Sequence, residues 1–163
     1  MKKTYYLLVV GLIMMVSCQP KNVPVDIEAE KAAITDLFDK FGAAYSAGDA
    51  ATLGSFLTED ALFMTTDPSE FWNKQQFTDL WAQTFADTVP ELQNLGEMEI
   101  KLAPDGKSAT MVHQYVMPGM IPKIPMRNAY HVVKTDDGWK IFVGNAALIP
   151  YNEDLPKIMS ALE

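Results

Sequence analysis

The sequence predicts an α+β fold, a cone in which three N-terminal helices pack on one face of a strongly bent, mainly antiparallel sheet. Two observations indicate this class. Apolar residues recur at helical spacing in the first half of the chain, and they alternate with polar residues around two Asp-Gly turns in the second half. Helices followed by a run of strands are typical of α+β domains. The 163 residues suit a single domain, which we expect over residues 27–163.

The first helix begins at Ile27 and ends before Gly48. Its apolar residues fall on one stripe: Ile27, Ile34, Leu37, Phe38, Phe41 and Tyr45. Gly48 can adopt the left-handed conformation that ends a helix, and Asp49 can cap a short second helix. The inward residues of that helix are Leu53, Phe56 and Leu57, and a strand follows at residues 62–64.

A third helix is predicted after a loop at residues 65–70. Asp67 and Glu70 fit a capping box over one helical turn, and Asn73 with Gln76 repeats the pattern at the start of the helix. The helix runs to about Asp87. Its inner stripe is Phe77, Leu80, Trp81, Thr84 and Phe85.

Two hairpins follow. Pairing of residues 97–103 with 108–117 sets Ile100 opposite Met111 and Leu102 opposite Ala109, which places Met111, His113, Tyr115 and Met117 on the inner face. Residues 117–126 are expected to form a long proline-rich connection, either a lid over the cone or a surface for a partner.

A three-residue loop at residues 136–138 defines the second hairpin. It pairs Val133 with Ile141, His131 with Val143 and Ala129 with Asn145. The inner face would then carry Arg127, Ala129, His131, Val133, Ile141, Val143 and Asn145. Leu155, Ile158, Met159 and Leu162 form one stripe of a short closing helix.

The N-terminus has the features of a secretory signal. Lys2 and Lys3 precede an apolar run at residues 5–16, which is short for a membrane span. Residues 15–18, Met-Val-Ser-Cys, resemble the lipobox of bacterial lipoproteins. The resemblance implies a signal peptide over residues 1–17, lipid such as palmitate on Cys18, a tether over residues 18–26, and anchoring in the cell envelope, expected at the outer membrane facing the periplasm. The alternative is an ordinary signal peptide with an incidental cysteine.

The charge of the chain limits its partners. The formal net charge is -8, and Arg127 is the single arginine. A nucleic-acid partner is therefore not expected, because binding to phosphates needs clustered Lys and Arg. Nothing in the sequence indicates a cofactor.

Three short motifs resemble the SnoaL-like branch of the nuclear transport factor 2-like superfamily: Ala47-Gly48-Asp49, residues 56–61 and residues 137–141. The resemblance implies a pocket between helices and sheet, which the superfamily uses in isomerases, cyclases, dehydratases and proteins that only bind. In the ketosteroid isomerases a tyrosine donor would fall on Phe41 and a carboxylate base on Thr65. Asp67 is the nearest carboxylate, two residues further on, so this particular activity is not expected.

Several residues are candidates for a site. His113 or His131, acting with Asp67, would supply a general acid or base near neutral pH. An inward Arg127 would offer a planar fork to a carboxylate. The other candidate ligand-binding residues are Tyr45, Trp72, Trp81, Tyr115 and Asn145. Tyr130 is a further aromatic residue that could line an apolar pocket. Each of these also fits an ordinary core or surface position. Two histidines without a third ligand do not predict a metal site.

Three functions remain open from the sequence. The favoured one is binding of a small apolar or carboxylate-bearing ligand, and the sequence leans against an enzyme. The second is proton transfer of the isomerase or dehydratase type, by His113 or His131 with Asp67. The third is a protein-interaction module or homodimer, formed through the outer sheet face or through residues 117–126.

Overall fold

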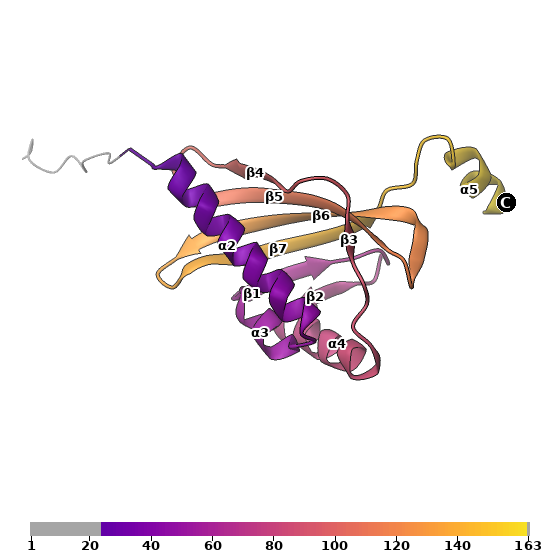
Figure 1. Ribbon diagram of the computed structural model, residues 1–163, viewed down its shortest axis with the longest axis horizontal. Coiled ribbons are helices and arrows are strands. Elements are labelled where there is room, and N and C mark those ends of the chain that lie inside the picture. Colours follow the sequence, from indigo (N-terminus) through magenta and orange to yellow (C-terminus); the bar gives the residue numbers. More distant parts are fainter. Residues whose placement is uncertain (1–23, 163) are drawn as a thin grey trace, which may run out of the picture.

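The computed structural model describes residues 24–162 and shows helices packed on a curled sheet (Figure 1). The helices are α2 (Ile27–Ser46), α3 (Ala50–Ser55), α4 (Lys74–Asp87) and α5 (Leu155–Ala161). The strands are β1 (Leu57–Met64), β2 (Phe71–Asn73), β3 (Gln93–Asn94), β4 (Glu99–Leu102), β5 (Ser108–Met117), β6 (Ile121–Thr135) and β7 (Gly138–Leu148). The α+β class and the packing of helices on a mainly antiparallel sheet are confirmed.

The sheet runs in the order β2-β1-β7-β6-β5-β3, and β4 also pairs with β5. The pairing of β1 with β7 is parallel, and the other strand pairs are antiparallel. In Figure 1, α2 crosses one face of the sheet diagonally, and α3 and α4 lie together near β1 and β2. A concave sheet face and three helices thus enclose the interior between them.

The helix ends follow the capping residues of the sequence. The Asp26 carboxylate accepts from the backbone N–H of Ala29 and begins α2, and Asp49 accepts from Thr52 and begins α3. Between them, Gly48 has a φ of 68°, the left-handed conformation expected there. Asn73 and Gln76 form the predicted capping box at the start of α4.

The first hairpin has the predicted register. Ile100 lies opposite Met111 and Leu102 opposite Ala109. Along β5, Met111, Tyr115 and Met117 are buried, and His113 is half-buried on the same face. The inner face predicted for β5 is therefore correct.

The second hairpin differs from the prediction. Its turn has two residues, so Thr135 pairs with Gly138 and Val132, not Val133, pairs with Ile141. An extra residue in β7, Phe142, then restores the predicted pairing of His131 with Val143. The predicted inner face of β6 is wrong: the inward residues are Met126, Asn128, Tyr130 and Val132.

Residues 117–126 are not a long connection. A tight turn follows β5, and Met117 pairs with Ile121 at the start of the 15-residue strand β6. The backbone N–H of Met120 donates to the carbonyl of Met117 across this turn, and the Met120 side chain is 61% exposed. A strand is possible here because Pro122 and Pro125 lie in a stretch with few pairing partners.

Three smaller expectations also change. Residues 67–70 form a turn that leads into β2, not a helical turn, although the Glu70 carboxylate accepts from the N–H of Asp67 as the capping pattern predicts. Strands β2 and β3 were not predicted. Helix α5 does not close the fold, since it buries no residue and stands apart from the sheet (Figure 1).

The core lies between α2, α3 and the concave face of the sheet. Its most completely buried large side chains are Ile34, Leu53, Leu57, Met111, Val132 and Ile141. At one end Glu30 of α2 accepts from the indole of Trp139 at 3.0 Å and from Lys134. These bonds fasten α2 to the β6–β7 hairpin, and they hold the pKa of Glu30 below its ordinary value, with the Lys134 bond as the largest cause.

The predicted signal peptide, Cys18 and most of the predicted tether lie outside the described residues. Within that tether, Val25 packs against Gly106, where an added Cβ would lie 2.6 Å from the Val25 side chain, and Asp26 caps α2. These two residues therefore belong to the folded domain. No helix within residues 24–162 is long and apolar enough to span a membrane.

Candidate functional site

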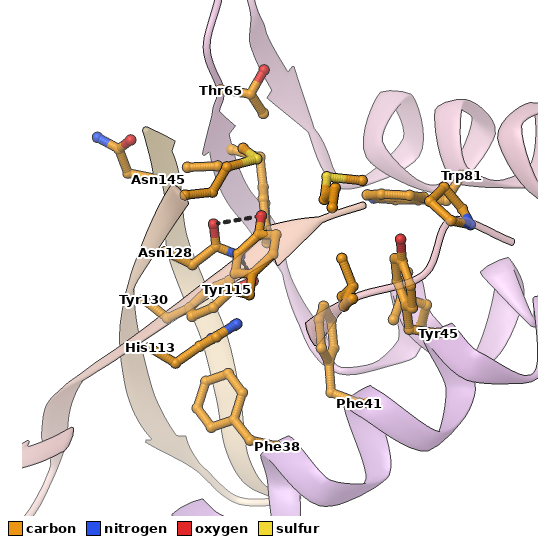
Figure 2. Close-up of a pocket in the computed structure, with 18 of the residues that line it drawn as sticks. Phe38, Phe41, Tyr45, Thr65, Trp81, His113, Tyr115, Asn128, Tyr130 and Asn145 are labelled. Atoms are coloured by element: carbon orange, nitrogen blue, oxygen red, sulfur yellow. Dashed lines mark hydrogen bonds between the residues drawn. The ribbon is translucent and has the colours of Figure 1, made fainter. Parts of the chain in front are cut away.

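A cavity of about 560 Å³ lies between α2, α4 and the concave face of the sheet. Residues of α2, α4, β1, β5 and β6 form its wall, and Figure 2 shows 18 of the lining residues. Much of the wall is aromatic or methionine: Phe38, Phe41, Tyr45, Phe63, Trp72, Phe77, Trp81, Tyr115, Tyr130, Met98, Met111, Met117, Met120 and Met126. Such a volume and lining are typical of a small-molecule site.

Aromatic side chains hold one another in place around this cavity. The Tyr45 ring lies edge to face with Trp81, at a centroid distance of 5.0 Å, and with Phe85 at 5.3 Å. The Phe63 and Phe77 rings lie 4.1 Å apart and join β1 to α4. Edge-to-face contacts of this kind add to the stability gained by burial, so the wall is largely preformed.

A hydrogen-bonded chain of three polar side chains crosses the wall. The Tyr115 hydroxyl donates to Oδ1 of Asn128 at 3.2 Å, and Nδ2 of Asn128 donates to the Tyr130 hydroxyl at 2.7 Å (Figure 2). Burial raises the pKa of both tyrosines above the ordinary value. Both hydroxyls are therefore neutral donors at physiological pH.

His113 lies beside these hydrogen-bonded side chains. Its ring stacks on Tyr130 at 6.2 Å and lies 5.1 Å from the Tyr115 ring. In Figure 2 a ring nitrogen of His113 points into the space between the sheet and α2. Burial lowers the pKa of His113, which favours the neutral imidazole.

Two further donors belong to helix residues that line the cavity, Tyr45 and Trp81. The Tyr45 hydroxyl and Nε1 of Trp81 are both buried and have no hydrogen-bond partner among the described residues. Burial raises the pKa of Tyr45, and the nearby Tyr115 adds to the shift. A buried donor without an acceptor is costly.

Charged groups are sparse around the cavity. Among the described residues the lining includes the carboxylates of Asp39 and Glu70 but no Lys or Arg. Glu70 accepts from the hydroxyl of Thr65 and from the N–H of Asp67, which fixes it at the end of β1. The site therefore favours a neutral molecule over an anion.

Most predicted pocket residues lie on the cavity wall. Tyr45, Trp72, Trp81, Tyr115 and His113 all line it. Their roles in binding or catalysis stay predictions, because orientation alone does not assign a role. Asn145 reaches the rim, but it is exposed and its amide points away from the cavity in Figure 2.

Three predicted residues lie elsewhere. His131 and Arg127 face the outer side of the sheet, where His131 packs beside Phe142 and Arg127 is exposed, so their predicted inward orientation is wrong. The reason is the burial of Tyr130 and Val132 on the opposite face of β6. Asp67 is exposed and does not line the cavity. Its carboxylate accepts from the backbone N–H and hydroxyl of Ser69, which lower its pKa.

Sequence reasoning missed Asn128, and its register placed Tyr130, an aromatic candidate for the pocket, on the outer face of β6. A signal was present, because Met126, Asn128, Tyr130 and Val132 alternate with Arg127, and a lone arginine is more readily placed on the solvent face. Within residues 24–162 no three His, Cys, Asp or Glu side chains gather where they could hold a metal ion.

Solved structures similar to this chain share its fold. A domain of unknown function with a cystatin-like fold from Nostoc punctiforme is 20% identical over 81% of this chain and 85% of its own, with a TM-score of 0.66. An NTF2-like protein with a cystatin-like fold from Novosphingobium aromaticivorans is 17% identical over 82% and 90%, with a TM-score of 0.63. An NTF2-like protein of unknown function from Shewanella baltica is 14% identical over 78% and 99%, with a TM-score of 0.62.

No curated protein matches the chain at a significant level. The sequence profile described as "SnoaL-like domain" matches residues 34–147, more than two thirds of the chain. This range runs from Ile34 in α2 to Ala147 in β7 and holds every residue that lines the cavity, and the similar structures agree with it in fold. The chain belongs to the SnoaL-like domain family, and its fold is like that of the NTF2-like proteins.

Proposed function

We propose that this SnoaL-like domain binds a small, neutral, mainly apolar molecule in the cavity between α2, α4 and the sheet. The observation that carries the proposal is the preformed aromatic and methionine wall around about 560 Å³. Burying apolar surface there is favourable by about 25 cal/mol per Å². The alternative of a carboxylate-bearing ligand depended on an inward Arg127, and that side chain is exposed on the outer face.

Native mass spectrometry of the purified full-length protein tests this proposal. We expect a complex heavier than the chain, from which an organic molecule is released on activation. Replacement of Met111 by Trp would fill part of the cavity, since Met111 lies on the wall and is 1% exposed. A folded variant that retains the same molecule in full would contradict binding in this cavity.

A second candidate is proton transfer, and His113 favours it. The imidazole lines the cavity and is kept neutral by burial, so it is able to accept a proton from a bound molecule. Asp67 and His131 do not line the cavity, so His113 would act without them. A bell-shaped pH dependence of turnover that disappears in His113→Gln would support this function, and turnover unchanged in that variant would oppose it.

We also propose that lipid on Cys18 anchors the protein in the bacterial envelope, at the outer membrane facing the periplasm. The support is the charged start, the apolar run and the small residue before Cys18. Labelling cells with an alkyne analogue of palmitate should mark the wild type but not Cys18→Ala, and only the wild type should sediment with membranes. Equal labelling of both proteins would contradict the anchor.

Homodimerisation stays a prediction. An exposed Met120 at the β5–β6 turn and an exposed Phe71 on β2 offer apolar contact surfaces. Light scattering on the Cys18→Ala chain distinguishes a monomer from a homodimer. The mass of a single chain over a range of concentrations would argue against a dimer.

A further inference from the structure

We propose that the Tyr115–Asn128–Tyr130 chain is a recognition subsite for a carbonyl oxygen of the bound molecule. This inference rests on the proposed function, and it names the chemical group that the cavity selects. The three side chains come from β5 and β6 and meet on the cavity wall (Figure 2). Two of them, Tyr115 and Tyr130, are 6% and 5% exposed, so these hydrogen bonds are shielded from bulk water.

Counting hydrogen-bond donors supports this assignment. The two tyrosines and the Asn128 amide have four polar hydrogens together. The bonds from Tyr115 to Asn128 and from Asn128 to Tyr130 use two of them. One tyrosine O–H and one amide N–H therefore remain, and no described residue accepts from them. Exchanging the amide oxygen and nitrogen of Asn128 does not change this number.

The order of the two hydrogen bonds makes the Tyr130 hydroxyl a stronger donor. Tyr130 accepts from an amide that itself interacts with the Tyr115 hydroxyl, and such chains polarise their members. A carbonyl oxygen has two lone pairs, which match the two remaining donors. A carboxylate fits less well, because no Lys or Arg of the described residues lines the cavity.

A matched pair of test ligands separates the carbonyl subsite from the proposed binding of a small apolar molecule. One is the naphthyl ketone propionyl-dimethylaminonaphthalene, and the other is its propyl counterpart, in which CH2 replaces C=O. Both are measured by fluorescence on the full chain carrying Cys18→Ala. We expect the ketone to bind about tenfold more tightly than the propyl compound, since a buried donor left without a partner is costly.

Tyr130→Phe should remove about that tenfold preference for the ketone and leave the propyl compound unaffected. Tyr151→Phe is the matched control, because Tyr151 is 55% exposed and lies outside the cavity wall, and it should change neither affinity. The infrared C=O stretch of the bound ketone reports the hydrogen bond to its carbonyl directly, in the absence of any substitution in the cavity. It should lie below its frequency in hexane, as a hydrogen-bonded carbonyl does.

The outcomes are distinct. Equal binding of the two compounds, or a bound C=O stretch equal to that in hexane, overturns the subsite and leaves the proposed function standing. Equal weakening of both compounds by Tyr130→Phe also overturns it, because that pattern reports a change in packing. Binding of neither compound by the wild-type sequence overturns the proposed function and the subsite together.

Discussion

Gly144 of β7 provides a test of how closely the cavity wall is packed. A Cβ added at Gly144 would lie 2.4, 2.7 and 2.8 Å from three atoms of the Phe63 ring, which is its neighbour across the parallel β1–β7 pair. Ordinary carbon contacts are about 3.5–4.0 Å, so the ring must move by about 1 Å. Phe63 is 5% exposed and its ring is 4.1 Å from that of Phe77, which leaves it little room.

We therefore expect Gly144→Ala to lower the free energy of unfolding by about 1–3 kcal/mol, the usual cost of overpacking a core. For a domain of this size each kcal/mol lowers Tm by about 3 °C. The displaced Phe63 ring should also narrow the cavity and weaken binding of the naphthyl ketone. Thermal and urea unfolding, followed by circular dichroism, measure the stability, and fluorescence titration measures the affinity.

Gly42→Ala is the matched control. Gly42 lies within α2, and a Cβ there would meet no atom within 4 Å. Replacing a glycine in the middle of a helix by alanine should stabilise the protein by about 0.5–1 kcal/mol. The two substitutions should therefore have opposite signs. A Gly144→Ala protein as stable as the wild type would refute the packing described for β1 and β7.

Three further predictions concern His113, the start of α4 and the end of α2. Because burial lowers the pKa of His113, the unfolded chain binds a proton that the folded chain resists, and stability should fall as pH drops below about 6.5. His113→Phe should reduce this loss and leave stability above pH 7 little changed, as urea unfolding over a pH series would show; parallel curves for both proteins would contradict it. Asn73→Ala should cost about 1 kcal/mol through loss of the capping box, measured by urea unfolding, whereas Asn152→Ala at an exposed site should cost little. Gly48→Ala should lower Tm, because φ is 68° and the new Cβ would lie 3.0 Å from Val89, and an unchanged Tm would exclude that strain.

The helices and the first hairpin could be predicted because their signals are local. The stripe on α2, the left-handed Gly48 and the cap at Asp49 each depend on residues within a few positions. The Pro-Asp-Gly-Lys turn likewise fixed the register of β4 and β5. The orientation of His113 and Tyr115 toward the interior followed from that register.

The turn of the second hairpin alone does not predict the orientation of β6. Two turn lengths fit Asp136-Asp137-Gly138 equally well, and the extra residue Phe142 then shifts the alternation of β7. Ala129 and Val133 are as apolar as the inward residues, so apolar content does not distinguish the two faces of β6, and Arg127 is the residue that does. The predicted register placed His131 and Arg127 on the inner face and Asn128 and Tyr130 on the outer face.

The exposed helix α5 illustrates a second limit. Leu155, Ile158 and Met159 form an apolar stripe, which normally predicts burial. Helix α5 nevertheless buries none of its residues. An amphipathic pattern shows which face would be covered, but it does not specify a partner for that face.

The methionine methyl groups offer the most direct test of the central claim, that the cavity binds a small neutral molecule. Among residues 24–162, five methionines line the cavity: Met98, Met111, Met117, Met120 and Met126. Met159 on α5 is 63% exposed and lies outside it, so it is an internal control. In a carbon-13 methyl NMR titration of the Cys18→Ala chain with the naphthyl ketone, the resonances of the five lining methionines should shift together and saturate, while Met159 stays unchanged. Shifts confined to Met159, or none at saturating ketone, would contradict the claim.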